Sequence, residues 1–311
     1  MKVSVRGNGA VELLAEHPVK ITNPEKLMWP EQGITKADYV KYLIDVSPWL
    51  LPHLQNRPLT VIRYPQGVHG HAFYQKNAPT GTPDWVKTAP IWSEDRKDMI
   101  HYVIVDSLAS LIWLGNLACL EFHVGFTTLL QPNHPTAVAF DLDPTVPGFE
   151  PVREVALTLH QLLKRLNLPH IPKTSGATGL QVFIPLTRGH SYEDTRVFTK
   201  AVAEYLLKRL PRIVTLERLT RNRKDKVYVD YPQHGASRTL IAPYSARARN
   251  HATVSTPLRW DELERGVTPE DFTILNVPGR LKKQGDPFTV PYQASLREIT
   301  AFLKNHPYQS L

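Results

Sequence analysis

The sequence predicts a mixed α+β fold, in which helices flank sheets that contain antiparallel strands. Segments with strand-like alternation and segments with helical spacing of apolar residues follow each other along the chain. Several strand-like segments are separated by only short connections, which favours mixed or antiparallel sheets over a purely parallel one. Because no shift in composition divides the chain, we expect a single domain over residues 1–311.

The N-terminal part of the chain combines two helices with several strands. Thr35 can cap a helix over 36–47, in which apolar residues recur with helical spacing. The other elements expected here are a β pair or loose arm over 1–20 with a turn at Asn8-Gly9, strands over 59–64, 102–105 and 120–124, and a buried helix over 107–118.

The C-terminal part alternates more regularly between strands and helices. Apolar residues along one side predict an amphipathic helix over 150–166, and Ser191 can cap a second helix that Pro211 ends. Strands are expected over 136–143, from 172, and over 180–186, 213–216 and 226–230, with further helices over 260–265 and 295–305.

Bulk composition restricts the class of protein. The formal net charge of +8 at pH 7 favours an anionic partner, most often nucleic acid. The single cysteine, Cys119, lies in an apolar stretch, so we expect a buried thiol in a reducing cytosol. The most apolar stretch, 107–122, is interrupted by Asn116 and Glu121, so no membrane contact is expected.

The segment VAFDLDPT (138–145) ends a predicted strand with two carboxylates. Asp141 and Asp143 would share one face of the strand, while Phe140 and Leu142 face the core. The Cα atoms of the two Asp residues are then roughly 6.5–7 Å apart, two rises of a strand. Carboxylates held this close commonly share a divalent cation, although a solvated strand end would show the same pattern.

A third carboxylate, Asp230, ends the apolar strand expected over 226–230. Tyr228 and Asp230 should share one face of it, opposite the two valines. By itself Asp230 fits an ordinary strand end. Together with Asp141 and Asp143 it suits a two-metal site for phosphoryl transfer.

Three further features suit phosphates and bases. The turn from Lys173 to Gly179 could gather backbone N–H groups around a phosphate, although it is not a Walker loop and could be an ordinary turn. Arginines and lysines bracket Asp230 and could neutralise phosphates. Phe73 and Tyr74, adjacent aromatics in a basic loop, suit base stacking, although at least one of them should pack inward.

Together these segments resemble a known family, the polymerase domain of bacterial ligase D, an archaeo-eukaryotic primase-like polymerase of non-homologous end joining. The resemblance implies a primase-polymerase-like fold with a catalytic cleft between sheets flanked by helices, and a core over about 20–290. The matching stretches are NPEK (23–26), RYPQGV with AFYQK (63–76), LEFHV (120–124), FDLDP (140–144), TSGATGLQVFIPL (174–186), KVYVDY (226–231) and RTLIAPYSARAR (238–249).

The resemblance implies an enzyme of DNA repair that adds nucleotides, with ribonucleotides preferred, to DNA 3′ ends or gaps under template direction. Two divalent ions, Mn²⁺ or Mg²⁺, would be held by the catalytic residues Asp141, Asp143 and Asp230. The implied nucleotide contacts are His123, Ser175, Gly176, Thr178, Gly179, Gln181, Arg223, Arg238 and Arg247, and the implied DNA contacts are Asn23, Lys26, Lys36, Arg63, Phe73, Tyr74 and Lys76.

The implied partners are DNA with 5′-phosphorylated gaps or ends, NTPs or dNTPs, and Ku with a separate DNA ligase, in the cytoplasm near the nucleoid. The sequence departs from the family pattern at three positions. Thr178 stands where Lys is frequent, Gln181 where His is frequent, and Ile62 where a basic residue is usual. Each change removes a potential positive charge near nucleotide or DNA. No KxDG-type motif is present, so nick sealing is not expected.

Two other functions fit parts of the sequence. FDLDPT matches the DxDxT signature of haloacid-dehalogenase-type phosphatases, with Asp141 as nucleophile and Asp143 as general acid, although about 140 residues precede it here. A DNA-end binder without catalysis would keep the fold and the basic charge. Template-dependent release of pyrophosphate separates a polymerase from both.

Overall fold

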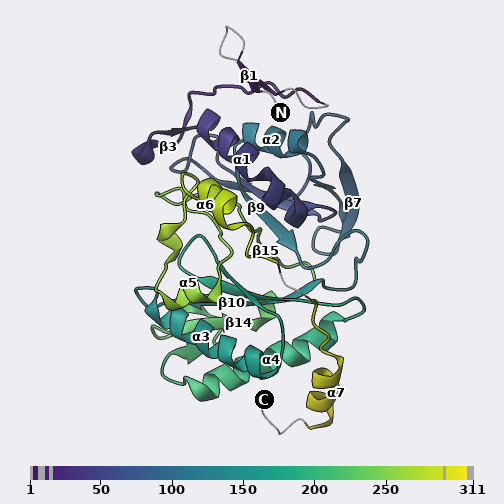
Figure 1. Ribbon diagram of the computed structural model, residues 1–311. Helices are drawn as coiled ribbons and strands as arrows, with labels where there is room; N and C mark the ends of the chain where they lie inside the picture. Colours follow the sequence, from purple (N-terminus) through teal and green to yellow (C-terminus); the bar gives the residue numbers. More distant parts are fainter. Residues whose placement is uncertain (1–2, 6–10, 14–16, 290–291, 307–311) are drawn as a thin grey trace. The chain divides into compact units, whose positions relative to one another are not determined.

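The chain forms two compact units, each assembled from three separate segments. The computed structural model describes residues 3–5, 11–13, 17–289 and 292–306, and Figure 1 labels its elements. The first unit comprises Met1–Val124, Leu240–Ser255 and Phe272–Gly285, and the second comprises Gly125–Thr239, Thr256–Asp271 and Asp286–Leu311. Both units combine helices with mainly antiparallel sheets, so the predicted α+β class is confirmed.

The first unit contains a six-stranded sheet. Its strands are β5 (Leu59–Arg63), β6 (Phe73–Gln75), β7 (Thr88–Ser93), β8 (Asp98–Val103), β9 (Cys119–Gly125) and β15 (Thr239–Ile241). The order is β15-β9-β5-β8-β7, with β6 paired to β5. The pairs among β5 to β9 are antiparallel.

Helices and two small sheets complete the first unit. They are β1 (Val3–Val5) with β2 (Val11–Leu13), β3 (Leu27–Trp29) with β4 (Ile34–Thr35), η1 (Pro30–Gln32), α1 (Lys36–Leu54), α2 (Leu108–Asn116) and α6 (Val277–Gln284). The β pair expected near the N-terminus is present, whereas its expected turn at Asn8-Gly9 lies outside the described residues. The Tyr39 hydroxyl on α1 donates to the Cys119 carbonyl on β9 at 2.7 Å, which ties the helix to the sheet.

Helix α1 is longer than the sequence predicted. Thr35 caps it as expected, with a reciprocal bond to Asp38, but the helix continues past residue 47 to Leu54 through Pro48 and Pro52. Proline removes a backbone donor from a helix. At Pro48 the loss is offset because the Ser47 hydroxyl donates to the Ile44 carbonyl at 2.9 Å.

The second unit contains a five-stranded sheet ordered β11-β12-β10-β14-β13. Its strands are β10 (Ala137–Pro144), β11 (Ile171–Thr174), β12 (Leu180–Pro185), β13 (Val214–Thr215) and β14 (Val227–Asp230). All neighbours are antiparallel except β13 and β14, which are parallel. Strand β10, the predicted carrier of two carboxylates, is therefore central and paired on both sides.

Two long helices pack on one face of this second sheet, as Figure 1 shows for α3 (Glu150–Arg165) and α4 (Tyr192–Arg209). The Phe140 ring on β10 lies 6.3 Å, centroid to centroid, from the Phe198 ring on α4. Phe140 and Leu142 are fully buried, as the alternation predicted. Asp141 and Asp143 therefore point to the other face. The remaining elements of this unit are η2 (Thr220–Asn222), η3 (Tyr231–Gln233), α5 (Trp260–Glu264), η4 (Pro269–Asp271) and α7 (Arg297–Asn305).

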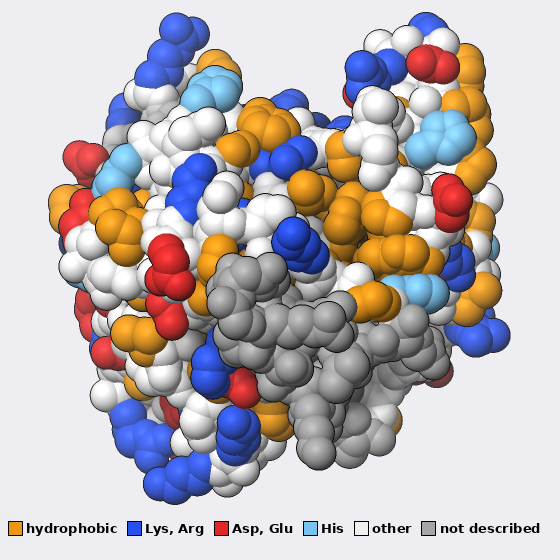
Figure 2. Space-filling model, turned by 90° about the horizontal axis from the view of Figure 1, so that it is seen from above, with side chains coloured by type: hydrophobic (Ala, Val, Ile, Leu, Met, Phe, Trp, Pro, Cys, Tyr) orange, Lys and Arg blue, Asp and Glu red, His pale blue; other side chains and the backbone are white. Residues whose placement is uncertain are grey.

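Three bulk expectations can be compared with the structure. Cys119 is fully buried, and burial raises the pKa of its thiol to about 12, so it is the unreactive thiol that was expected. In the described part of the chain, no helix combines the length and the apolar character needed to cross a membrane. On the face shown in Figure 2, Lys and Arg side chains are spread out rather than gathered in one patch. Charge alone therefore does not locate a binding site there.

Candidate functional site

The three predicted catalytic carboxylates lie on adjacent antiparallel strands of the second unit. Asp141 and Asp143 are on β10, and Asp230 ends β14. In the register, Asp141 is directly opposite Asp230, and Asp143 is opposite Tyr228. Residues paired in this way have Cβ atoms roughly 4.5–5.5 Å apart on the same face of the sheet. The sheet thus brings Asp230 next to a pair of carboxylates that precede it by about ninety residues in sequence.

Asp141 has the most unusual environment of the three. Its side chain is buried, at 9% exposure, and its Oδ1 atom has no hydrogen-bond partner among the described residues. Burial raises the pKa of Asp141 to about 7, and the charges of Asp143 and Asp230 add to this, while Gln181 and Lys173 oppose it. A buried carboxylate oxygen without a donor, next to two further carboxylates, is a position that a bound cation would stabilise.

Asp230 is held by its own strand end. Its Oδ1 atom accepts hydrogen bonds from the Tyr228 hydroxyl at 3.1 Å and from the Gln233 backbone N–H at 3.0 Å, which caps η3. Burial and the Asp230 charge raise the pKa of Tyr228, so this hydroxyl stays protonated as a donor. Asp230 is thereby fixed beside Asp141, where it would be one of the ligands of a bound metal.

The donor set fits hard divalent cations, because carboxylate oxygens are the ligands that Mg²⁺ and Mn²⁺ prefer. Within residues 17–289 and 292–306 and the two N-terminal strands, no group of three or more His, Cys, Asp or Glu side chains is gathered closely enough to hold a metal as it stands. The fit therefore rests on the pairing of Asp141 with Asp230 and on the unpartnered Asp141 oxygen.

The predicted phosphate-binding turn lies against the end of β10. The Ser175 hydroxyl oxygen accepts hydrogen bonds from the backbone N–H groups of Ala177 at 3.1 Å and Gly179 at 3.0 Å. A Cβ atom on Gly179 would lie 2.5 Å from the Leu142 carbonyl oxygen and 3.4 Å from Asp143 Oδ1. Two of the N–H groups expected to gather around a phosphate thus hold the turn itself together.

The other residues of this turn differ in exposure. Gly176 has a φ of +68°, a conformation that favours glycine, and is buried. Thr178 is exposed at the tip. Gln181 is buried and lies directly opposite Asp141 in the register of β12 and β10. Of these predicted nucleotide contacts, Gln181 and Gly179 lie closest to the carboxylates by register and by contact.

The two arginines predicted in the second unit are placed differently. The Arg223 guanidinium lies 4.1 Å from the centroid of the Tyr228 ring and donates to the carbonyls of Glu217 and Arg218. Tyr228 in turn bonds Asp230, so Arg223 belongs to the surroundings of the carboxylates. Arg238 is exposed, and among the described residues no hydrogen bond or ion pair ties it to them.

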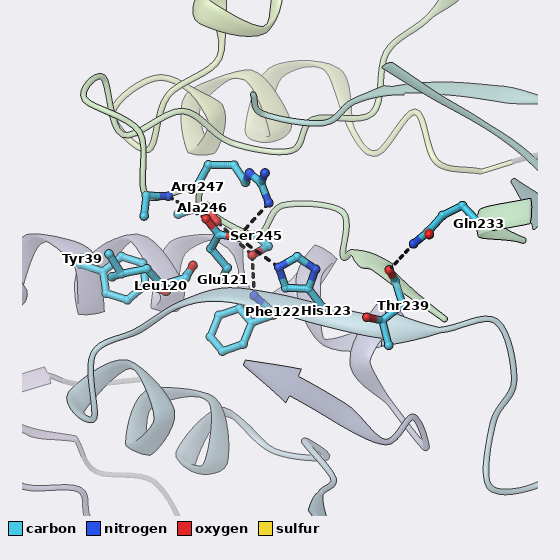
Figure 3. A network of polar contacts seen from close by, with 11 residues as sticks. Tyr39, Leu120, Glu121, Phe122, His123, Gln233, Thr239, Ser245, Ala246 and Arg247 are labelled. Carbon is cyan, nitrogen blue, oxygen red and sulfur yellow. Dashed lines mark hydrogen bonds and ion pairs between the residues drawn. The ribbon is translucent and has the colours of Figure 1, made fainter. Parts of the chain in front are cut away.

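The remaining two predicted nucleotide contacts, His123 and Arg247, belong to the first unit and meet at Glu121. Figure 3 shows both side chains directed toward this carboxylate. Glu121 Oε2 accepts from Arg247 Nη1 at 2.8 Å and lies 3.1 Å from His123 Nε2, while Oε1 accepts from the Ala248 backbone N–H at 3.1 Å. Burial by itself would raise the pKa of Glu121, yet the His123 hydrogen bond and the Arg247 charge lower it.

Predicted DNA contacts near the start of the first unit form a compact group. The Lys36 side chain is buried, and its Nζ donates to the carbonyls of Thr22 at 2.8 Å and Asn116 at 3.0 Å. Burial and the charge of nearby Lys26 lower the pKa of Lys36. The Asn23 carbonyl accepts from the Lys26 backbone N–H at 3.1 Å, so the three residues lie together. Two ammonium groups held near each other suit a bound anion.

The aromatic pair corrects one expectation. Phe73 and Tyr74 are exposed by 37% and 54%, so neither packs inward as expected for at least one of them. Strand β6 is a three-residue strand off the main path of the sheet, and the described elements leave both aromatic side chains uncovered. The Arg63 guanidinium lies 4.9 Å from the centroid of the Phe73 ring and bonds Gln75, and the half-buried Lys76 follows directly.

Sequence reasoning missed two charged residues that contact predicted site residues. They are Glu121 in the first unit and Lys173 in the second. Glu121 stands two positions before His123 in an otherwise apolar strand, the same i, i+2 spacing that identified the Asp141 and Asp143 pair. Lys173 is a lysine inside a fully buried four-residue strand. In both cases the signal was a charge within an apolar β segment, which requires a buried partner.

Three comparisons place the chain among known proteins. The family profile described as LigD, primase-polymerase domain, matches residues 35–288. The chain is 40% identical over 275 residues to the bifunctional non-homologous end joining protein LigD of Bacillus subtilis. This alignment covers 88% of the present chain and 44% of the Bacillus subtilis protein. The chain is also 33% identical over 286 residues to the multifunctional non-homologous end joining protein LigD of Mycolicibacterium smegmatis. That alignment covers 88% of the present chain and 37% of the other protein.

A solved structure agrees with these matches. The polymerase domain from Mycobacterium tuberculosis ligase D in complex with DNA aligns with a TM-score of 0.80 and 33% identity, over 91% of this chain and 98% of that one. The chain spans less than half the length of the curated relatives, so it is similar to one part of each.

Proposed function

Because the chain belongs to the LigD primase-polymerase domain family, we propose that it is a nucleotidyltransferase of non-homologous end joining, which adds nucleotides to DNA 3′ ends or gaps under template direction. The observation that carries the proposal is the direct pairing of Asp141 with Asp230, with Asp143 on the same face. Three carboxylates on one face of a sheet are the ligand set that two-metal phosphoryl transfer requires.

Asp141, Asp143 and Asp230 would hold two divalent ions, Mn²⁺ or Mg²⁺. Bound there, the ions would stabilise negative charge on the attacking oxygen and on the pyrophosphate leaving group. Asp230 would also help to activate the primer 3′-hydroxyl, and its contact with the protonated Tyr228 hydroxyl supports a fixed orientation for this role.

Nucleotide-binding roles are proposed for residues in each of the two units. In the second unit, Arg223 and the turn at Ser175 would neutralise phosphate charge or donate to phosphate oxygens. In the first unit, Glu121 fixes His123 and Arg247 in one network, so that the remaining donors of these side chains can face a ligand. The preference for NTPs over dNTPs follows from the resemblance and is part of the proposal.

Lys26, Lys36 and Asn23 would bind the 5′-phosphate of the downstream strand, and the exposed Phe73 and Tyr74 would stack on bases of the template. The lowered pKa of Lys36, caused by burial and by Lys26, supports an anion site, since an anion would relieve the repulsion between the two ammonium groups. The solved relative is a complex with DNA, which supports DNA as the partner. Ku, a separate ligase and a location near the nucleoid belong to the same proposal.

Extension of a gapped duplex that carries a 5′-phosphate tests the proposal. Each nucleotide set, NTPs or dNTPs, is offered with Mn²⁺ or with Mg²⁺, on templates with different bases in the gap. We expect incorporation of the complementary nucleotide with release of pyrophosphate, and faster incorporation of ribonucleotides. Incorporation that ignores the template base would refute template direction while leaving nucleotidyl transfer in place.

The same assay separates the two alternatives. Release of phosphate from a simple phosphomonoester, without template, would indicate a phosphatase that uses Asp141 as nucleophile. The family match over residues 35–288 does not favour that reading. Normal binding of DNA ends with no incorporation under any divalent metal would indicate a non-catalytic end binder.

A further inference from the structure

One row of side chains crosses four neighbouring strands of the second unit's sheet. Lys173 on β11 is directly opposite Gln181 on β12, which is opposite Asp141 on β10. Asp141 is in turn opposite Asp230 on β14. Side chains of directly opposed residues share a face. The row therefore carries an ammonium group at one end and two carboxylates at the other.

Lys173 is fully buried, with 0% exposure. Its Nζ donates to Gln181 Oε1 at 2.6 Å. The same Nζ lies 5.6 Å from the centroid of the Phe183 ring, which is on β12 like Gln181. A buried ammonium group is costly unless hydrogen bonds and a nearby opposite charge compensate it. The carboxylate nearest to Lys173 along the row is Asp141, with only Gln181 between them, and the positive charge of Lys173 lowers the pKa of that carboxyl against the effect of burial.

Gln181 connects the two charged groups in one orientation. Its Oε1 atom is occupied by the Lys173 ammonium, so the amide nitrogen is the atom left to donate to Asp141. The hydrogen bond from Gln181 lowers the pKa of Asp141, as a donor to a carboxylate should. The other Asp141 oxygen, Oδ1, is left without a partner among the described residues. Lys173 thereby fixes which oxygen of Asp141 remains available.

We propose that Lys173 is a built-in counter-charge for the acidic face and, through Gln181, a positioning residue for the Asp141 carboxylate. When no divalent ion is bound, the ammonium offsets part of the repulsion among the three carboxylates. When an ion binds, the same positive charge opposes it, so Lys173 weakens metal affinity while it stabilises the metal-free protein. The second part of this inference rests on the proposed function, whereas the first part does not.

A double-mutant cycle on the whole chain in EDTA at pH 8 tests the first part. Lys173→Met removes the charge and keeps an unbranched side chain, and Asp141→Asn removes the carboxylate charge at the same size. We expect Lys173→Met to lower the melting temperature by roughly 5 °C or more, and by less than half as much in the Asp141→Asn background. Equal losses in both backgrounds would mean that Lys173 only packs, and the inference would be overturned.

If Lys173→Met does not fold, Gln181→Met takes its place in the same cycle, because it removes the link and keeps the length of the side chain. Val182→Ala is the matched control. Val182 is fully buried on the same strand, and its side chain points to the opposite face from Gln181. It should lower the melting temperature equally with and without Asp141→Asn.

The second part is tested by the rise in melting temperature that Mn²⁺ causes. We expect this rise to be larger in Lys173→Met than in the parent, unchanged in Val182→Ala, and lost in Asp141→Asn. A rise in Lys173→Met equal to that of the parent would overturn the opposition between ammonium and metal. A parent protein with no rise would instead contradict the metal site of the proposed function, and the cycle in EDTA would still decide on the counter-charge.

Discussion

Asp141 and Asp230 lie directly opposite each other on neighbouring antiparallel strands, although they are far apart in sequence. Their pairing makes a sharp prediction about catalysis. Asp141→Ala or Asp230→Ala should reduce nucleotide addition by at least about 100-fold, since a ligand of the proposed metal ions is lost. Binding of a gapped duplex, measured by fluorescence anisotropy, should be retained. Addition at the parent rate by either variant would refute the assignment of these residues.

The Glu121 network predicts a defect in nucleotide binding rather than in the chemical step. Glu121→Gln weakens the fixation of His123 and Arg247, so KM for the nucleotide should rise about tenfold, worth about 1.4 kcal/mol, with a smaller change in kcat. Steady-state kinetics on a gapped template measures both constants. Glu262→Gln, at a buried glutamate of the second unit, is the control and should leave KM unchanged. A fall in kcat alone would contradict the positioning role of Glu121.

Gly179 should be sensitive to the smallest possible substitution. In Gly179→Ala the new Cβ would lie 2.5 Å from the Leu142 carbonyl oxygen, so the turn must move away from β10. We expect a loss of about 1–3 kcal/mol in the free energy of unfolding and slower nucleotide addition. Gly279→Ala in α6 meets nothing within 4 Å and should be neutral or slightly stabilising. Denaturant unfolding compares the two variants, and equal effects would contradict the tight contact.

Acid should destabilise the protein partly through His234. This side chain is buried, its Nε2 lies 2.8 Å from the Thr195 hydroxyl, and its Nδ1 has no partner among the described residues. Burial lowers the pKa of His234 from 6.5 to about 4. The unfolded chain therefore binds a proton that the folded chain does not between these two pH values, so stability is full above pH 6.5 and falls as the pH drops.

The expected loss from this histidine is on the order of 3 kcal/mol between pH 6.5 and pH 4. His234→Gln should flatten this part of the pH profile of the free energy of unfolding, measured by denaturant titration at several pH values. A variant whose profile has the same slope as that of the parent would show that other groups cause the acid sensitivity.

The exposed aromatic side chain of Tyr74 should contribute to DNA binding and little to stability. Tyr74→Ala should weaken binding of a gapped duplex by about 1–3 kcal/mol, the value of one base stacked on an aromatic ring. Its melting temperature should stay close to that of the parent, because the side chain is 54% exposed. Phe302→Ala, at a comparably exposed aromatic residue of α7, should leave DNA binding unchanged. Equal binding by both variants would remove Tyr74 from the DNA interface.

Alternation along single strands correctly predicted the fold class and which side chains of β10 face the core. It placed Phe140 and Leu142 in the core and Asp141 and Asp143 on the other face, because a side-chain period of two holds in any strand. It could not give the register that pairs Asp141 with Asp230, since pairing depends on the whole sheet. The inference that the three Asp residues converge came from the presence of three carboxylates at strand ends and from the family resemblance, not from strand periodicity.

The misses have local physical causes. Strand β7 was not predicted because its sequence, TAPIWS, contains Pro90 and lies at the edge of the sheet, where proline is tolerated. Its partner β8 spans Asp98–Val103 and so begins earlier than the strand expected at 102–105. Helix α1 runs past its expected end through Pro48 and Pro52, and at Pro48 the Ser47 hydroxyl donates to the Ile44 carbonyl in place of the missing backbone donor. Lys173 was passed over because only the register reveals its link to Asp141.

The interleaving of the two units along the chain has a consequence for synthesis on the ribosome. The segment that ends at Val124 lacks β15 and α6, which the chain supplies only after it has passed through most of the second unit. The first unit can therefore complete its fold only after most of the second unit has left the exit tunnel. Cutting the gene between the units would not yield two autonomous fragments, and attempts to produce either one separately should give insoluble material unless all three of its pieces are rejoined.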